Sequence, residues 1–106
     1  MSVKDIDDKN FEEVKKSGKA VVKFHADWCG PCQMLKPIYK DVSGKIPGVN
    51  FFSVNVDEAV ETADRYGVMS IPTMILFEKG AEKDRIVGAS NVESLVDEIK
   101  EKFGSN

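Results

Sequence analysis

The hydrophobic pattern of the chain predicts at least four short strands. Residues 20–26 are apolar at almost every position, and residues 49–56 alternate only loosely between apolar and polar side chains. Both runs are typical of strands covered on two faces. Residues 73–77 and 84–87 predict two more strands, and because the Lys79-Gly80 turn separates them, we expect an antiparallel hairpin.

Capping residues predict the first and the last helix. Asp8 can accept hydrogen bonds from the first turn of a short helix that Gly18 closes. Near the C-terminus, Ser90 and Glu93 have capping-box spacing, which predicts that Ser90 is the N-cap. The helix that follows places its apolar residues on one face: Val92, Leu95, Val96, Ile99 and Phe103.

Two further helices are predicted between the strands. Apolar residues recur at helical spacing from Cys32 to Gly44, and we expect a kink at Pro37, which cannot donate a backbone hydrogen bond. Residues 58–66 predict a shorter helix. With one more short strand near Val3, this alternation of strands and helices predicts an α/β fold.

Composition limits the size, the partners and the location of the protein. A chain of 106 residues that is 42% hydrophobic has room for a single domain, residues 1–106. The net charge of −3 gives no electrostatic reason to expect a nucleic acid or a membrane as partner. No run is long enough to span a bilayer, and the charged residues 1–8 do not resemble a secretory signal. We therefore expect a cytoplasmic protein, in which cysteines stay reduced and act as working thiols.

The two cysteines lie in the segment Trp28-Cys29-Gly30-Pro31-Cys32, between a predicted buried strand and a helix. Cys29 is then at the helix N-terminus, where unpaired backbone N–H groups stabilise a thiolate. We expect Cys29 to be the exposed, attacking thiol and Cys32 to be turned into the helix. On the first helical turn Cys32 is within reach of Cys29, so it can resolve a mixed disulfide formed there.

A metal site is the main alternative for this motif, because Cys-x-x-Cys is also half of a zinc ligand set. A closed zinc site needs four ligands, and besides Cys29 and Cys32 the chain offers only His25 and carboxylates. The redox interpretation is therefore favoured, with no metal and no cofactor expected.

The segment Val22-Lys23-Phe24-His25-Ala26-Asp27-Trp28-Cys29-Gly30-Pro31-Cys32 resembles the active-site strand and loop of the thioredoxin family. Pro37, the loop Ser70-Ile71-Pro72-Thr73 and the segment Val87-Gly88-Ala89 fit the same family at the same spacing. Thioredoxins are themselves a standard example of a thiol activated at a helix N-terminus. The resemblance implies a thioredoxin fold, with a central mixed sheet of four to five strands flanked by about four helices.

The resemblance also implies a groove for protein substrates, whose residues would be Trp28, Gly30, Pro31, Ile71, Pro72 and Gly88. A cis Pro72 would hold the Ile71 backbone so that it pairs with an extended substrate segment. From the residues alone, Trp28 could instead serve packing, and Pro72 could be an ordinary proline at the start of a strand.

The activity implied is reduction of protein disulfides by a monomer. A separate thioredoxin reductase would supply the electrons, since the chain has no dinucleotide-binding glycine motif. A binding module that uses the same groove without turnover is a second possibility. An oxidase or isomerase is disfavoured by Gly30-Pro31 and by the absence of an export signal.

Two positions depart from the family pattern. Lys23 stands where most thioredoxins have a buried acid, and Ser53 stands where many bacterial members have a lysine. The ammonium of Lys23 must reach solvent, pair with an acid, or lose its charge, and we expect one of the first two. If it stays charged near Cys32, it favours the thiolate. For His25 we expect a partly buried, hydrogen-bonded ring rather than a general base.

Overall fold

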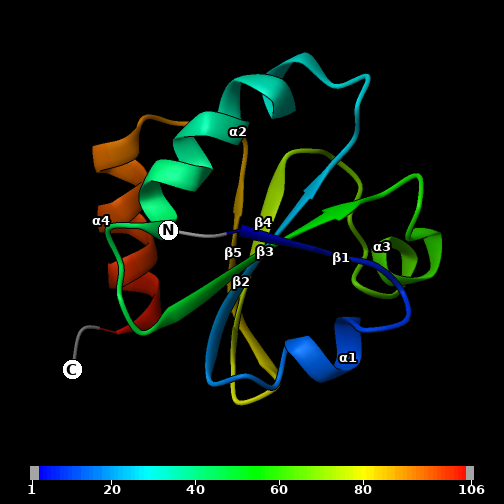
Figure 1. Ribbon diagram of the computed structural model, residues 1–106, viewed down its shortest axis with the longest axis horizontal. Helices are drawn as coiled ribbons and strands as arrows, with labels where there is room; N and C mark the ends of the chain where they lie inside the picture. The colour runs from blue at the N-terminus through cyan, green and yellow to red at the C-terminus, as the bar shows by residue number, and fades with distance from the viewer. Residues whose placement is uncertain (1–2, 105–106) are drawn as a thin grey trace.

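The computed structural model describes residues 3–104, which are built around one five-stranded sheet (Figure 1). The strands, in chain order, are β1 Val3–Ile6, β2 Lys19–His25, β3 Val49–Asn55, β4 Thr73–Glu78 and β5 Ala81–Val87. Their order across the sheet is β1-β3-β2-β4-β5. The pairs β1–β3 and β2–β3 are parallel, whereas β2–β4 and β4–β5 are antiparallel. The predicted mixed sheet and its hairpin are confirmed, as is the short strand near Val3.

Four helices cover the two faces of this sheet. They are α1 Phe11–Val14, α2 Gly30–Ser43, α3 Val60–Arg65 and α4 Val92–Phe103. Figure 1 shows α2 and α4 on one side of the sheet and α1 and α3 on the other. The fold class predicted from the sequence is therefore confirmed. The helix α1 ends well before Gly18, and the kink at Pro37 inside α2 stays a prediction.

The core has two layers that share the central strands. On the side of α2 and α4, Leu35 and Ile99 pack with Val21 of β2. On the opposite side, Phe11 packs with Val22, the next residue along β2. Successive side chains of a strand point to opposite faces, so a strand covered on both sides must be apolar throughout, which explains the continuous run predicted as β2.

The helix α4 begins at a different residue from the one predicted. Its N-cap is Asn91, whose side-chain oxygen accepts a 2.9 Å hydrogen bond from the backbone N–H of Ser94. The buried hydroxyl of Ser90 has no hydrogen-bond partner among residues 3–104. The capping box predicted at Ser90 is therefore wrong, because the residue with the extended backbone just before the helix is Asn91.

Asp8 caps a helix, but not its own. Its carboxylate accepts hydrogen bonds from the backbone N–H of Thr62 at 2.9 Å and from the Thr62 hydroxyl at 2.5 Å, at the start of α3. The hydroxyl bond is the main reason that the pKa of Asp8 lies below its usual value. The prediction that Asp8 caps α1 is wrong, because the α3 N-terminus lies beside this segment and supplies the donors.

Within residues 3–104, no helix is both long enough and apolar enough to cross a membrane.

Candidate active site

The two cysteines lie where β2 gives way to α2. Cys29 is the N-cap of α2, with an extended backbone, and its Sγ accepts a 3.2 Å hydrogen bond from the backbone N–H of Cys32. A disulfide joins Cys29 and Cys32, whose Cα atoms are 5.2 Å apart. Gly30 and Pro31 form the exposed first turn between them. Proline fits there because a backbone N–H in the first turn of a helix makes no hydrogen bond within the helix, so its absence costs nothing. The predicted position of the motif is confirmed.

Both cysteines are buried, contrary to the expected difference in exposure. Cys29 is 5% exposed and Cys32 is 3% exposed. They form a small apolar cluster with Ala26, against which Ile71 packs. The Ile71 carbonyl oxygen lies 3.8 Å from Cys29 Sγ. The prediction of an exposed Cys29 is wrong because the loop before β4 folds over the disulfide, which only tertiary structure arranges.

That loop contains the peptide bond Ile71-Pro72, which is cis, as predicted. The backbone N–H of Gly88, just after β5, donates a 2.9 Å hydrogen bond to the carbonyl of Pro72. Gly88 has a φ of 96°, in the left-handed region that favours glycine. The structure thus brings Pro72 and Gly88 together, and Ile71 of the same loop lies beside Cys29.

Trp28 stands at the surface next to the disulfide, with 72% of its area exposed. Packing is therefore not its role. Its indole Nε1 donates a 2.9 Å hydrogen bond to the carboxylate of Asp57, which follows β3. The sequence reasoning missed Asp57, although parallel strands carry their C-terminal ends to the same edge of a sheet, and that rule would have pointed to it.

Lys23 lies in the middle of β2, beneath α2, and is 3% exposed. Its ammonium sits 4.9 Å from the centre of the Tyr39 ring, and no carboxylate of residues 3–104 forms an ion pair with it. Burial, with a smaller effect from Lys36, lowers the pKa of Lys23 from 10.5 to about 8. The expectation that this ammonium reaches solvent or pairs with an acid is wrong.

His25, at the end of β2, is half-buried, as expected. Its pKa is lowered, first by burial and then by the charge of Lys23. The structure shows no hydrogen bond between its ring and the other described residues, in contrast to the prediction.

The described part of the chain, residues 3–104, contains no group of three or more histidine, cysteine or acidic residues arranged to hold a metal ion.

A Cys-x-x-Cys disulfide at a strand-to-helix junction, beside a cis-proline loop, defines a thiol–disulfide oxidoreductase. Comparison with known proteins agrees: the thioredoxin family model matches residues 2–101. The chain belongs to the thioredoxin family. Members of this family use such a dithiol to reduce disulfides in proteins and are themselves reduced by a reductase.

Individual relatives are similar over most of the chain. The thioredoxin of Chlamydia pneumoniae is 43% identical over 97 residues, which cover 92% of this chain and 95% of that protein. The thioredoxin of Staphylococcus saprophyticus is 39% identical over 101 residues, covering 94% and 97%. The solved structure of a Malassezia sympodialis thioredoxin has a TM-score of 0.85 at 32% identity, covering 96% of this chain and 94% of that one.

Proposed function

We propose that this protein reduces disulfides of protein substrates with Cys29 as the attacking thiol and Cys32 as the resolving thiol. The observation that carries this order is the hydrogen bond from the Cys32 backbone N–H to Cys29 Sγ. A donor at a helix N-terminus stabilises negative charge, so the thiolate forms preferentially on Cys29.

The exchange proceeds in two displacements. The Cys29 thiolate attacks one sulfur of the substrate disulfide, and the other substrate sulfur leaves as a thiolate that takes up a proton. Cys32, once deprotonated, attacks Cys29 Sγ, forms the Cys29–Cys32 disulfide and releases the second substrate thiol. The substrate has gained two electrons, and a thioredoxin reductase returns two electrons to the protein.

We assign substrate binding to the surface around the disulfide, formed by Trp28, Gly30, Pro31, Ile71, Pro72 and Gly88. Of the five large apolar side chains exposed within residues 3–104, four belong to or flank these segments: Trp28, Met34, Met69 and Val87. Exposed apolar side chains in these segments favour contact with another protein. The Ile71 carbonyl, 3.8 Å from Cys29 Sγ, lies where a substrate strand next to the disulfide could pair with it.

We further propose that residues 1–106 act as a single domain, as a monomer in the cytoplasm. The two core layers share the same central strands, which supports one folding unit. Light scattering coupled to gel filtration would test the monomer, and a dimer mass at micromolar concentration would contradict it.

The order of attack predicts which cysteine variant traps substrates. In Cys32→Ser the mixed disulfide at Cys29 cannot be resolved, so incubation with an oxidised protein such as insulin should give a covalent adduct, seen by mass spectrometry. The matched Cys29→Ser variant should give less adduct by a factor of at least about ten, because its remaining thiol, Cys32, is not at the helix N-terminus.

Insulin reduction by dithiothreitol provides the complementary measurement. The wild-type protein should accelerate the reaction, and a binding module with inert thiols would not. Trapping by Cys29→Ser instead of Cys32→Ser would reverse the assigned roles.

A further inference from the structure

The feature that carries a further inference is a buried cation beneath the redox pair. In the sheet, Lys23 of β2 pairs in register with Ser53 of β3 and Met74 of β4, neither of which can carry a compensating charge. Asp5 of β1 is one strand farther, in register with Ser53. Burying a charged group in this way destabilises the folded protein unless a nearby group of opposite charge interacts with it.

Two pockets meet at Lys23. One, of about 250 Å³, is lined by Lys23 and Cys32 together with side chains of the loop after β2. The other, of about 610 Å³, is lined by Lys23, Asp5 and Ser53. Lys23, Lys36 and Pro37 line both. Lys23 is therefore a buried cation that borders the same pocket as Cys32.

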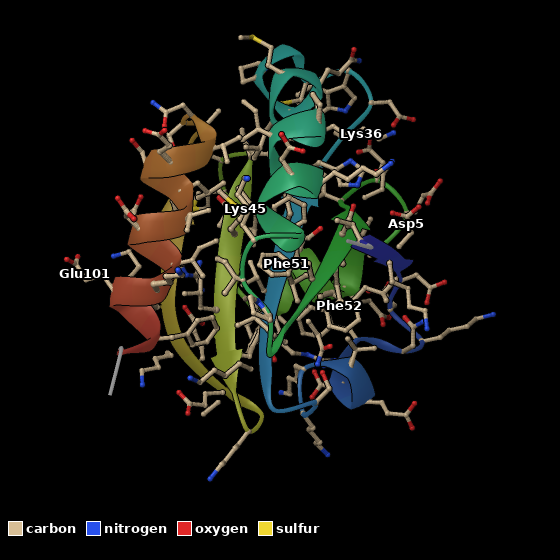
Figure 2. The ribbon with its side chains drawn as sticks, turned by 60° about the vertical axis from the view of Figure 1, so that its left-hand side comes forward. Asp5, Lys36, Lys45, Phe51, Phe52 and Glu101 are labelled. Carbon is tan, nitrogen blue, oxygen red and sulfur yellow. A yellow bond between two sulfur atoms is a disulfide. The ribbon has the colours of Figure 1, made fainter. Side chains whose placement is uncertain are left out.

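The surroundings of Lys23 hold its ammonium in this place. On the α2 side the ammonium lies 4.9 Å from the centre of the Tyr39 ring, and the Tyr39 hydroxyl donates a 2.8 Å hydrogen bond to the Phe52 carbonyl oxygen. The titratable groups that line these pockets with Lys23 come from β1, from α2, from the end of β2 and from the loop after it: Asp5, Lys36, Tyr39, Lys40, His25 and Asp27. Figure 2 shows Asp5 and Lys36 on the side of α2 that faces away from α4.

We propose that the ammonium of Lys23 stabilises the Cys32 thiolate of the reduced protein across the pocket that they share, and so favours the reduced form. The disulfide carries no charge, so the attraction acts on the dithiol state alone. Lys23 is a positioning residue here, because it acts on Cys32 and touches no substrate. The proposal rests on the family's thiol–disulfide exchange and assigns this chain a residue that sets its redox equilibrium.

The equilibrium with glutathione measures this effect directly. Two glutathione thiols reduce the Cys29–Cys32 disulfide: one sulfur–sulfur bond breaks, one forms between the glutathiones, and the two electrons pass to the protein. Of the two protons that the glutathiones give up, the protein binds fewer when Cys32 stays a thiolate, and the buffer takes the rest. At about pH 7.5 the constant for reduction should be about tenfold larger in wild type than in Lys23→Met, which is about 30 mV for a two-electron couple.

The dependence on pH distinguishes a charge effect from a structural one. As the pH is lowered toward about 5, the population of the Cys32 thiolate should fall in both proteins, so the two constants should converge. The ultraviolet absorbance of the thiolates should show a higher pKa for Cys32 in Lys23→Met. Equal constants at both pH values, or a difference that persists at the lower pH, would overturn the proposal.

Two other lysines provide matched controls that also remove one positive charge. Lys36 borders the same pockets but is exposed, so Lys36→Met should change the constant by less than about threefold because water screens its charge. Lys45 lies on the side of α2 that faces α4 and lines a different pocket, so Lys45→Met should leave the constant unchanged (Figure 2). An effect of Lys45→Met as large as that of Lys23→Met would assign the shift to net charge and contradict the proposal.

The wild-type protein alone allows a second test, which does not depend on whether a variant folds. Coupling between two charges is reciprocal, so a Cys32 thiolate must raise the pKa of Lys23. NMR titration of the Lys23 side chain should give a value near 8 in the disulfide form. It should give a clearly higher value in the dithiol form, and equal values in the two forms would show that Lys23 and Cys32 do not interact.

Discussion

Lys23 is a charged residue in a strand whose burial favours apolar side chains. Every other residue between Ala20 and Phe24 is an apolar side chain buried between two layers of helices. An ammonium in the same strand loses its hydration and gains in return the face of the Tyr39 ring and a small attraction to Asp5. The fold therefore carries a cost at this position that a methionine would remove.

This cost should depend on pH. The folded-state pKa of Lys23, about 8, is below the value of 10.5 for an unfolded chain. Between these values the unfolded chain binds the proton and the folded protein does not, so stability rises with pH across that window. Relative to Lys23→Met, the oxidised protein should be about 3 kcal/mol less stable at neutral pH, and the difference should vanish toward pH 10.5.

Urea denaturation at several pH values, without reductant, would measure this difference. Lys45→Met is the control, and its difference from wild type should show no such trend, because Lys45 is exposed and does not contribute to the shift in the pKa of Lys23. A difference between Lys23→Met and wild type that stays constant with pH would mean that Lys23 keeps an ordinary pKa in the folded protein.

At the scale of elements, the residues of the site are positioned by the ends of helices and strands. The N-terminus of α2 supplies the donor for Cys29, and the ends of β2 and β3 bring Trp28 to Asp57. The helix α4 contains none of the residues assigned to the site and serves packing, with Leu95, Ile99 and Phe103 buried. Its capping can therefore be changed without replacing a residue of the site.

The capping of α4 gives a prediction with two neighbouring residues. Asn91→Ala removes the bond to the Ser94 N–H and should lower the free energy of unfolding by about 1 kcal/mol. Ser90→Ala removes a hydroxyl that bonds to no group in the described part of the chain, so it should change stability by less than about 0.5 kcal/mol. Urea denaturation of the two variants would show which residue caps α4. A larger loss of stability in Ser90→Ala than in Asn91→Ala would support the capping box predicted from the sequence.

At the scale of the whole molecule, the two core layers are not independent. Val21 and Val22 are neighbours in β2, yet one packs under α2 and α4 and the other faces α1 and α3. Loss of either layer would leave a face of β2 and β4 exposed to water. We therefore expect all described elements to unfold in one cooperative transition.

One variant from each layer tests this expectation. Phe11→Ala and Ile99→Ala each delete a buried side chain and should each cost about 3 kcal/mol. In both variants, Trp28 fluorescence and far-ultraviolet circular dichroism should keep the same denaturation midpoint. Separate midpoints for the two probes in Phe11→Ala would show that the α1–α3 layer unfolds alone.

The sequence by itself determined the elements and the redox motif. Local patterns encode these: continuous apolar runs predict the buried strands, the Lys79-Gly80 turn predicts the hairpin, and two residues separate Cys29 from Cys32 at a strand-to-helix junction. The cis form of Pro72 came only from the family resemblance, since a single sequence does not specify the isomer of an X–Pro bond.

Only the tertiary structure decided which groups from distant segments meet. Asp8 caps α3 through Thr62, Asp57 holds Trp28, and the Ile71 loop buries Cys29, all across separations of at least 29 residues. The lowered pKa of Lys23 is also decided by the tertiary structure, because α2 packs over the strand and removes water from the ammonium. Hydrogen-bonding and charge effects depend on distances in space, and the spacing of residues along the chain does not contain those distances.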